Sequence, residues 1–228
     1  MPSRAEGTSP LLLFVAERSD MRKTAADPLA AKDGPGKSEA IFEQAVRIFQ
    51  QKGYHATSVQ DIADAVGLQK GSLYHYISSK EELLFQIFER GSRSLTYRLE
   101  EIAASDDPPT VKLEHAIEAH LVELCRHLDM FTVYLSERRA LEGRHSAKVH
   151  TQGERHARLL ERIIQEGIRS GEFRAVDPKM AAHAILGMCN WLYQWYSPGG
   201  RLSPEGIARI FSDLALRGLA APSKREQK

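Results

Sequence analysis

Apolar residues recur at helical spacing through nearly all of the chain that follows Ser38. In the first such segment they stand three and four residues apart and share one face of a helix. Serine favours the N-cap of a helix, and glycine favours the position just after its end. The pattern therefore predicts a helix that Ser38 caps and Gly53 stops. Its apolar face consists of Ile41, Ala45, Ile48 and Phe49.

A short helix is predicted after this glycine. Either Thr57 or Ser58 opens it, and Gln60 stands three residues after Thr57, which is the spacing of a capping box. The apolar positions begin at Val59, and Gly67 ends the helix after about two turns.

A second short helix and then a long one follow. The short helix runs from about Gln69 to Tyr76. Ser79 and Glu82 have capping-box spacing and predict the start of the long helix. Apolar residues keep helical spacing as far as Ile102, so the long helix extends at least to that residue.

Proline and glycine divide the remainder of the chain into further helices. Proline cannot occupy a helix interior, so the run DDPPT, residues 106–110, ends the long helix. Helices are predicted near residues 110–127, 130–142, 146–170 and 178–196, with a last one from Ser203-Pro204 to about Gly218. Because no segment reads as a convincing strand and there is no heptad or internal repeat, the predicted fold class is all-α.

Composition limits the class of protein. A chain of 228 residues with 42% hydrophobic residues can form one large domain or a small domain beside a larger one. The net charge of +1 indicates no particular partner, so any anion-binding surface must come from local segregation of charge. Cys125 and Cys189 lie far apart, which fits a reducing compartment. No apolar run approaches the roughly 20 residues that span a membrane, so a cytoplasmic protein without a membrane partner is expected.

The two chain ends show no helical periodicity. Residues 1–37 mix proline, glycine, alanine and charges and predict a disordered arm, and residues 221–228 predict a tail. The apolar run Leu11–Ala16 is short for a signal-peptide core and has no cleavage site after it. Met21 is an alternative to Met1 as the native start.

The two short helices joined by a tight turn at Gly67 are the sequence form of a helix-turn-helix. Between Asp64 and Glu81 there is no acidic residue, which suits a helix that enters a groove lined by phosphates. Hydroxyl and ammonium groups donate to phosphates, and histidine can donate to a base acceptor. Leu73 and Ile77, four residues apart, would point toward the core.

A surface helix in an ordinary bundle shows the same apolar spacing, so periodicity leaves both interpretations open. Acidic residues outnumber basic ones between Glu39 and Arg90, whereas a nucleic-acid module is usually basic. A DNA-binding domain in this segment therefore has to keep its acids away from the groove.

The segment Ile41–Leu84, IFEQAVRIFQQKGYHATSVQDIADAVGLQKGSLYHYISSKEELL, closely resembles the N-terminal domain of TetR-family transcriptional regulators. The resemblance covers the whole helix-turn-helix and includes the stretches GYHATSVQDIA, VGLQKGSLYHYI and SKEEL. It implies a homodimer that binds double-stranded operator DNA, usually as a repressor, and releases it when a small molecule binds the C-terminal domain. The expected domains are residues 38–84, a three-helix DNA-binding domain, and residues 85–220, a helical bundle for ligand binding and dimerisation.

The resemblance also implies which residues contact DNA. Thr57 and Ser58 would touch phosphate, where the helix dipole favours an anion. Tyr74 and Tyr76 would grip phosphates, and Lys80 would reach the DNA backbone. The residues that would enter the groove are Gln69, Lys70, Gly71 and Ser72, with His75 over the bases. For each side chain the alternative is solvent or core.

The C-terminal half is similar to one branch of the family. Glu166–Leu219 resembles regulators of fatty-acid, aromatic-acid and sterol breakdown that respond to acyl-CoA thioesters, and its most telling part is NWLYQWYSPGGRLS. The resemblance implies an acyl chain among Phe131, Leu135, Met188, Trp191 and Trp195. It places the CoA phosphates beside Arg138, Arg139, Arg144 and Lys148. A solvated helix face is the alternative for that basic cluster.

The resemblance further implies that two helices pair with those of a second copy in a four-helix bundle. Residues 146–170 and 178–196 are the candidates. By helical spacing Trp191, Leu192 and Trp195 share an apolar side. The alternative is that these side chains fill the core of the monomer.

Other functions lack a supporting constellation. No nucleophile elbow, phosphate loop or dinucleotide fingerprint occurs, so an enzyme is not expected. His115 and His120 stand five residues apart and cannot share a metal ion on one helix, so no metal or cofactor besides the effector is expected. The first alternative is a TetR-type regulator of efflux or stress genes that senses another hydrophobic ligand. A more remote one is an all-α enzyme or a helical adaptor with a vestigial helix-turn-helix.

Overall fold

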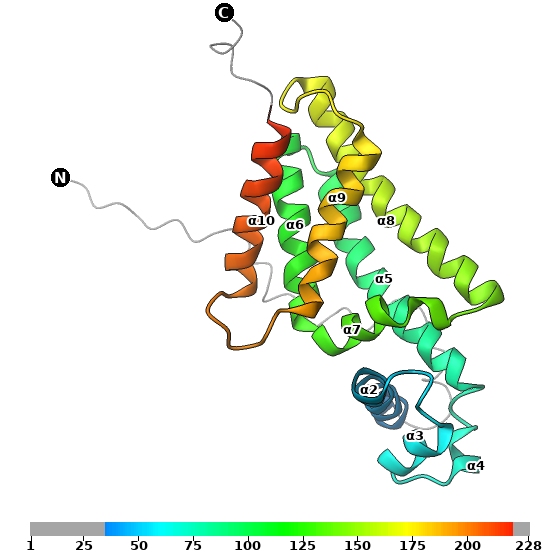
Figure 1. The fold of residues 1–228 in the computed structure, drawn as a ribbon. Coiled ribbons are helices and arrows are strands. Elements are labelled where there is room, and N and C mark those ends of the chain that lie inside the picture. Colours follow the sequence, from blue (N-terminus) through cyan, green and yellow to red (C-terminus); the bar gives the residue numbers. More distant parts are fainter. Residues whose placement is uncertain (1–34, 221–228) are drawn as a thin grey trace, which may run out of the picture.

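The computed structural model describes residues 35–220 (Figure 1). The predicted tail, the run Leu11–Ala16 and Met21 lie outside that range, as does the predicted arm up to residue 34. Residues 35–37 were also expected in the arm but form the beginning of the first helix instead. Among the helices of residues 35–220, none combines the length and the apolarity needed to cross a bilayer.

The described part of the chain is all-α, as predicted, apart from an isolated bridge between Phe173 and Ala220. The helices are α2 (Pro35–Lys52), α3 (Val59–Ala65), α4 (Lys70–Leu73), α5 (Lys80–Ala104), α6 (Pro109–Arg126), α7 (Leu128–Ser136), α8 (Gly143–Ser170), α9 (Pro178–Asn190) and α10 (Pro204–Leu219). Two 3-10 turns, η1 (Arg138–Ala140) and η2 (Trp191–Gln194), follow α7 and α9.

The first core joins α2, α3 and α4 to the beginning of α5. Phe49 of α2, Ile62 of α3, Leu73 of α4 and Phe88 of α5 are buried together there. Val133 of α7 is buried in the same cluster, and α2 packs against α7. The N-terminal unit is therefore attached to the rest of the molecule by an apolar interface as well as by the chain.

The second core lies among α5, α6, α8, α9 and α10, which stand side by side in Figure 1. Ile117 of α6 and Ile163 of α8 are fully buried in it. Lys112 of α6 is 7% exposed, and its ammonium group donates to the Glu166 carboxylate of α8 at 3.0 Å. This ion pair adds a polar link to the apolar packing of the two helices.

Helix α5 belongs to both cores. Phe88 lies in the first core, and Leu95 and Leu99 lie in the second. Because a continuous helix is stiff over this length, α5 is a direct mechanical connection between the N-terminal unit and the C-terminal bundle.

Several helices begin or end at the glycine and proline residues that the sequence analysis used as boundaries. Gly53 follows α2 and Gly171 ends α8, with φ angles of 82° and 80°. Asp177 and Ser203 accept backbone N–H bonds at the starts of α9 and α10, and a proline follows each of them.

One predicted helix start is wrong, and of the two residues expected to open α3 the structure selects Ser58. Helix α2 begins at Pro35, so Ser38 lies buried inside the helix instead of capping it. Helix α3 is capped by Ser58, and its capping-box partner is Asp61 instead of Gln60.

The predicted helix at residues 178–196 is also wrong at its C-terminal end, because α9 stops at Asn190 and η2 follows. A 3-10 helix turns by about 120° per residue, compared with about 100° in an α-helix. Leu192 is fully buried, whereas Trp191 and Trp195 are 61% and 52% exposed, so the three do not share one side.

Candidate nucleic-acid interface

The turn between α3 and α4 sets the direction of the second helix. Gly67 has a φ of 66°, in the left-handed region that favours glycine, and the Leu68 N–H donates to the Ala63 carbonyl at 2.9 Å. Leu73 and Ile77 are 0% and 3% exposed, so both point into the core as predicted. They fix α4 on the N-terminal unit with its other side outward.

The outward side of α4 and of the turn after it carries polar groups. Exposed there are Gln69, Lys70, Gly71, Tyr74 and His75, while Ser72 and Tyr76 are half-buried. A Cβ added at Gly71 would meet no protein atom within 4 Å, so the protein's own packing does not require glycine there. The structure thus brings seven of the predicted DNA-binding residues to one segment, where Tyr76 also packs against the first core.

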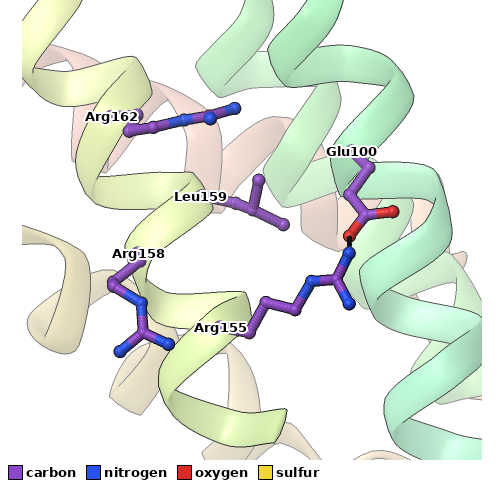
Figure 2. A pocket seen from close by; sticks show the side chains of 5 residues that line it. All are labelled: Glu100, Arg155, Arg158, Leu159 and Arg162. Atoms are coloured by element: carbon purple, nitrogen blue, oxygen red, sulfur yellow. Dashed lines mark ion pairs between the residues drawn. The ribbon is translucent and has the colours of Figure 1, made fainter.

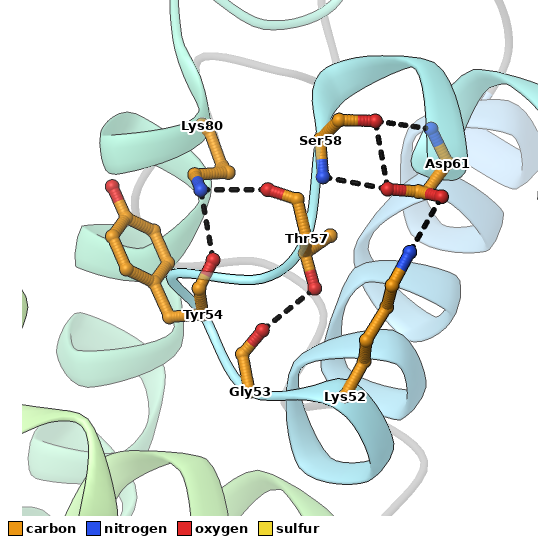
Figure 3. A network of polar contacts seen from close by, with 7 residues as sticks. All are labelled: Lys52, Gly53, Tyr54, Thr57, Ser58, Asp61 and Lys80. Atoms are coloured by element: carbon orange, nitrogen blue, oxygen red, sulfur yellow. Dashed lines mark hydrogen bonds and ion pairs between the residues drawn. The ribbon is translucent and has the colours of Figure 1, made fainter.

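The first turn of α3 is closed by its own hydrogen bonds (Figure 3). The Ser58 hydroxyl donates to the Asp61 carboxylate at 2.7 Å and accepts from the Asp61 N–H at 3.1 Å. Thr57 is 2% exposed, and its hydroxyl donates to the Gly53 carbonyl at 2.7 Å. The Thr57 hydroxyl is therefore buried in the turn, and the phosphate contact of Thr57 stays a prediction. Ser58 is exposed, but its hydroxyl proton is already used within the domain.

The acidic group at this turn is compensated by a lysine. Lys52 Nζ lies 2.8 Å from Asp61 Oδ1. Hydrogen bonds from Lys52 and then from Ser58 hold the pKa of the Asp61 carboxyl well below its usual range. The sequence interpretation missed this pair, although the spacing Ser58-x-x-Asp61 is that of a capping box with aspartate in place of glutamate.

The ammonium group of Lys80 lies inside the same network (Figure 3). Its Nζ donates to the carbonyls of Tyr54 at 2.8 Å and Thr57 at 2.6 Å, and lies 4.2 Å from the centre of the Tyr54 ring. Burial lowers the pKa of Lys80. These bonds hold the loop between α2 and α3 against the start of α5. Lys80 therefore positions the loop that leads into α3, and the contact of Lys80 with the DNA backbone stays a prediction.

Two polar contacts join the N-terminal unit to the C-terminal half. The Tyr54 N–H donates to Glu137 Oε1 at 3.1 Å. His145, near the start of α8, has Nδ1 at 2.9 Å from Glu81 Oε1 and stacks on the Phe85 ring with centroids 4.3 Å apart. A displacement of α7 or α8 relative to α5 would change these contacts, so they are points through which the C-terminal half can act on the N-terminal unit.

A cleft of about 840 Å³ opens beside η1. Leu135, Arg138 and Arg139, three of the predicted ligand residues, line it together with Tyr193 and His150. Within residues 35–220, no ion pair between either guanidinium and a carboxylate is found. The cleft therefore combines apolar walls with positive charge that the described residues leave uncompensated.

The residues predicted to hold an acyl chain are otherwise dispersed. Phe131 is fully buried in the second core, and Met188 packs against that core. Trp191 and Trp195 are mostly exposed to solvent. These four side chains do not line the cleft beside η1.

The remaining two predicted phosphate ligands lie outside the same cleft. Arg144 is exposed at the start of α8. Lys148 forms an ion pair with Glu89 of α5, and its Nζ lies 5.0 Å from the centre of the Phe85 ring. Of the predicted basic cluster, the structure thus brings only Arg138 and Arg139 to the cleft.

Three arginines of α8 form another basic surface, which the sequence interpretation missed (Figure 2). Arg155, Arg158 and Arg162 line a groove of about 450 Å³ with Glu100 of α5. Arg155 is paired with Glu100 at 2.5 Å, and Arg158 lies 3.5 Å from Glu154. The spacing of three and four residues would have placed these arginines on one helix face. Since carboxylates compensate two of them, the groove offers less unpaired positive charge than the cleft beside η1.

Known protein families match both halves of the chain. Residues 41–87 match the bacterial regulatory proteins of the tetR family, and residues 106–219 match the tetracyclin repressor-like C-terminal domain. The HTH-type transcriptional repressor KstR2 of Rhodococcus jostii (strain RHA1) is 28% identical over 203 residues, which cover 86% of this chain and 98% of that protein.

Solved structures of similar proteins agree with the fold. The TetR family transcriptional regulator PfmR from Thermus thermophilus has a TM-score of 0.73 and 37% sequence identity, over 78% of this chain and 97% of that one. AibR in complex with isovaleryl coenzyme A and operator DNA has a TM-score of 0.71 and 29% identity, over 82% of this chain and 99% of that one. Members of this family are transcriptional regulators and not enzymes. The chain, with its anchored helix-turn-helix unit and its helical C-terminal half, is a DNA-binding regulator that belongs to the TetR family.

Proposed function

We propose that the protein is a homodimeric repressor that binds operator DNA through two copies of α4 and releases it when a hydrophobic effector binds the C-terminal half. An acyl-CoA is the first candidate for the effector, and the cytoplasm is the compartment in which such a regulator meets DNA. The observation that carries the proposal is the exposed surface of Lys70, Tyr74 and His75 on a segment that buried Leu73 anchors. A short helix held in this way is already ordered before it enters the major groove, so binding does not have to offset the entropy cost of ordering it.

Within this surface, two kinds of DNA contact are proposed. Lys70 and His75 carry groups that can read base edges, and the Tyr74 and Tyr76 hydroxyls donate to phosphates. Because Gly71 leaves open space at its Cβ position, a DNA strand can approach the backbone closely there. Gln69 and Ser72 flank this point and complete the proposed interface.

The homodimer is supported by the distribution of exposed apolar side chains. Met180 of α9, Trp191 of η2, and Ile210 and Leu214 of α10 are between 46% and 63% exposed. Exposed apolar groups that gather on neighbouring elements mark a surface that another molecule covers. The exposed side of α8 carries arginines instead, so α10 replaces the helix at residues 146–170 as the proposed partner of α9 in the interface.

Two observations support an acyl-CoA as the effector: the arginines at the cleft beside η1 and the ligand described for a similar protein. AibR is described in complex with isovaleryl coenzyme A and operator DNA. The phosphates of CoA need cations, and Arg138 and Arg139 supply them at a cleft whose size is in the range of small-molecule sites. Leu135 and Tyr193 provide an apolar wall beside these arginines.

The proposal is tested first on DNA. The full chain is titrated against the DNA upstream of its own gene and against scrambled DNA, in band-shift assays at several salt concentrations. Tight binding to the upstream DNA that weakens steeply as salt rises is expected, because lysine and arginine contacts release counterions from DNA. Absence of binding to any duplex at low salt would contradict the regulator function proposed for this surface.

The effector is tested on the preformed complex. Long-chain and short-chain acyl-CoA thioesters at micromolar concentration should release the DNA. Arg138→Gln with Arg139→Gln should raise the required concentration about tenfold or more, since each charge-assisted bond contributes about 1.5 kcal/mol. Arg155→Gln with Arg158→Gln, in the other basic groove, is the matched control and should change little. Release by a different hydrophobic compound but by no thioester would favour a regulator of efflux or stress genes.

A further inference from the structure

A small cavity lies inside the second core, among α5, α6, α8 and α9. Its volume is about 10 Å³. Most of its walls are apolar, but two histidines from different helices, His120 of α6 and His156 of α8, line it as well. The other lining residues are Leu99, Ala116, Ile117, Leu160, Ile185, Leu186 and Cys189. Neither histidine belongs to the cleft beside η1 or to the DNA-binding surface.

Both histidines have a nitrogen that lacks a partner within the described chain. His120 is 6% exposed, and the two rings lie 5.5 Å apart. The Nδ1 atoms of His120 and His156 are out of contact with solvent and accept or donate no hydrogen bond within residues 35–220. A buried polar atom without a partner is unfavourable, so a group that pairs with it on entering the core gains binding energy.

The protonation of His120 follows from its neighbour. Its Nε2 lies 2.9 Å from Asn190 Oδ1, and an amide oxygen only accepts, so Nε2 carries the proton. Burial lowers the pKa of His120 to about 4 and that of His156 to about 3, where the charge of His120 adds to the effect. Both rings are neutral near pH 7. His120 Nδ1 is therefore an acceptor, whereas His156 Nδ1 can carry a proton and donate.

An acceptor and a donor on two rings that line one small cavity match a hydroxyl group. A hydroxyl donates to one nitrogen and accepts from the other. A carbonyl or carboxylate oxygen can only accept and leaves His120 Nδ1 unpaired, and a hydrocarbon leaves both nitrogens unpaired. The surrounding leucine and isoleucine side chains require that the rest of the inserted group be apolar.

We propose that the effector carries a hydroxyl on its buried apolar part, and that this hydroxyl bonds to the Nδ1 atoms of His120 and His156. The inference rests on the effector class proposed above and specifies it as a hydroxylated acyl thioester. In the present packing the cavity has room for about one water molecule, so the helices around it must separate to admit the ligand. Leu99 of α5 forms part of the wall, so such a separation acts directly on the helix that carries the N-terminal unit.

The proposal is tested with matched thioesters. Dodecanoyl-CoA and dodecanoyl-CoA hydroxylated at carbon 3, 8 or 12 are titrated against the protein bound to its operator. At least one hydroxylated chain should release the DNA at about a tenfold lower concentration than the unsubstituted chain. His156→Leu, which keeps a similar volume, should remove this advantage, and His156→Asn, which keeps a donor near Nδ1, should retain part of it.

Controls separate this inference from the effector class itself. His127→Leu, at an exposed histidine just after α6 that lines neither the cavity nor the cleft, should leave the preference unchanged, and thermal unfolding reports whether each variant is folded. If dodecanoyl-CoA releases the DNA at least as well as every hydroxylated chain, the acyl-CoA effector stands and the hydroxyl subsite is refuted. The subsite is refuted likewise if the advantage survives in His156→Leu. If no thioester releases the DNA, the subsite and the effector class fall together.

Discussion

The ammonium group of Lys80 supports the loop that leads into α3, because it donates to two carbonyls of that loop. Lys80→Met keeps most of the aliphatic stem but removes these donors. We expect the free energy of unfolding to fall by about 1 kcal/mol or more, since the Tyr54 and Thr57 carbonyls lose their partner. DNA affinity should fall for all sequences alike. Urea unfolding and band shifts measure the two effects.

The control for Lys80 is Lys70→Met on exposed α4. It should leave the stability unchanged and alter DNA binding alone, because Lys70 forms no bond of this kind within the described chain. An unchanged midpoint of unfolding in Lys80→Met would contradict the positioning role.

The two buried histidines make the stability of the second core depend on pH. Burial lowers the pKa of His120 to about 4 and of His156 to about 3, whereas an unfolded histidine has a pKa of about 6.5. Between about pH 6.5 and pH 4 the unfolded chain therefore binds more protons than the folded chain, and the free energy of unfolding falls as the pH falls. Thermal unfolding at a series of pH values measures the slope. His120→Leu with His156→Leu should make the slope smaller, and an unchanged slope would argue against buried neutral rings.

At the scale of single elements, α3 depends on its cap. It spans seven residues, too few for a helix that is stable by itself. Ser58→Ala removes the hydroxyl that pairs with the Asp61 N–H, and we expect a loss of about 1 kcal/mol in the free energy of unfolding. Ser78→Ala, at an exposed position just before α5, is the control and should cost much less. Equal losses in the two variants would show that the cap contributes nothing specific.

The sequence predicted elements well where a local signal controls the backbone. Gly53 and Gly171 adopt the left-handed conformation that ends a helix, and Asp177-Pro178 starts one, so these boundaries agree with the structure. Leu73 was correctly placed in the core because helical spacing alone decides which side of so short a helix is buried. The fold class followed from such signals, whereas the family was identified from the resemblance of residues 41–84 to TetR-family regulators.

Features that depend on distant parts of the chain were not predictable in this way. Lys80 reads as a phosphate ligand in the sequence, but its partners are carbonyls more than 20 residues away. Trp191 was expected to share an apolar side with Leu192 and Trp195, but α9 ends at Asn190, and Leu192 is buried while Trp191 is 61% exposed. The pairing of His120 with His156 joins two helices through tertiary packing, and no spacing in the sequence indicates it.

At the scale of the whole molecule, α5 connects the proposed effector sites to the helix-turn-helix unit. Lys80 at its start holds the loop that leads into α3, Glu81 beside it contacts His145 of α8, and Leu99 in its second half lines the histidine cavity. A ligand that changes the packing around Leu99 therefore changes the position of α4 without a flexible joint between them. Effector binding and DNA binding are linked in this geometry because each biases the same helix.

In the proposed homodimer the interface sets the distance between two α4 segments, and this requirement gives the last prediction. Two recognition helices read adjacent major grooves when they lie about 34 Å apart, so loss of the dimer should leave each copy with a single half-site. Ile210→Glu with Leu214→Glu places charges on the exposed apolar side of α10, where they cannot be buried against a second copy without a large cost. Sedimentation equilibrium should show a monomer at micromolar concentration, and operator affinity should fall about 100-fold or more as the two-site advantage disappears. Arg162→Glu on the exposed side of α8 is the matched control, and it should remain dimeric. A dimer that survives both charges on α10 but dissociates in the α8 variant would transfer the interface to α8.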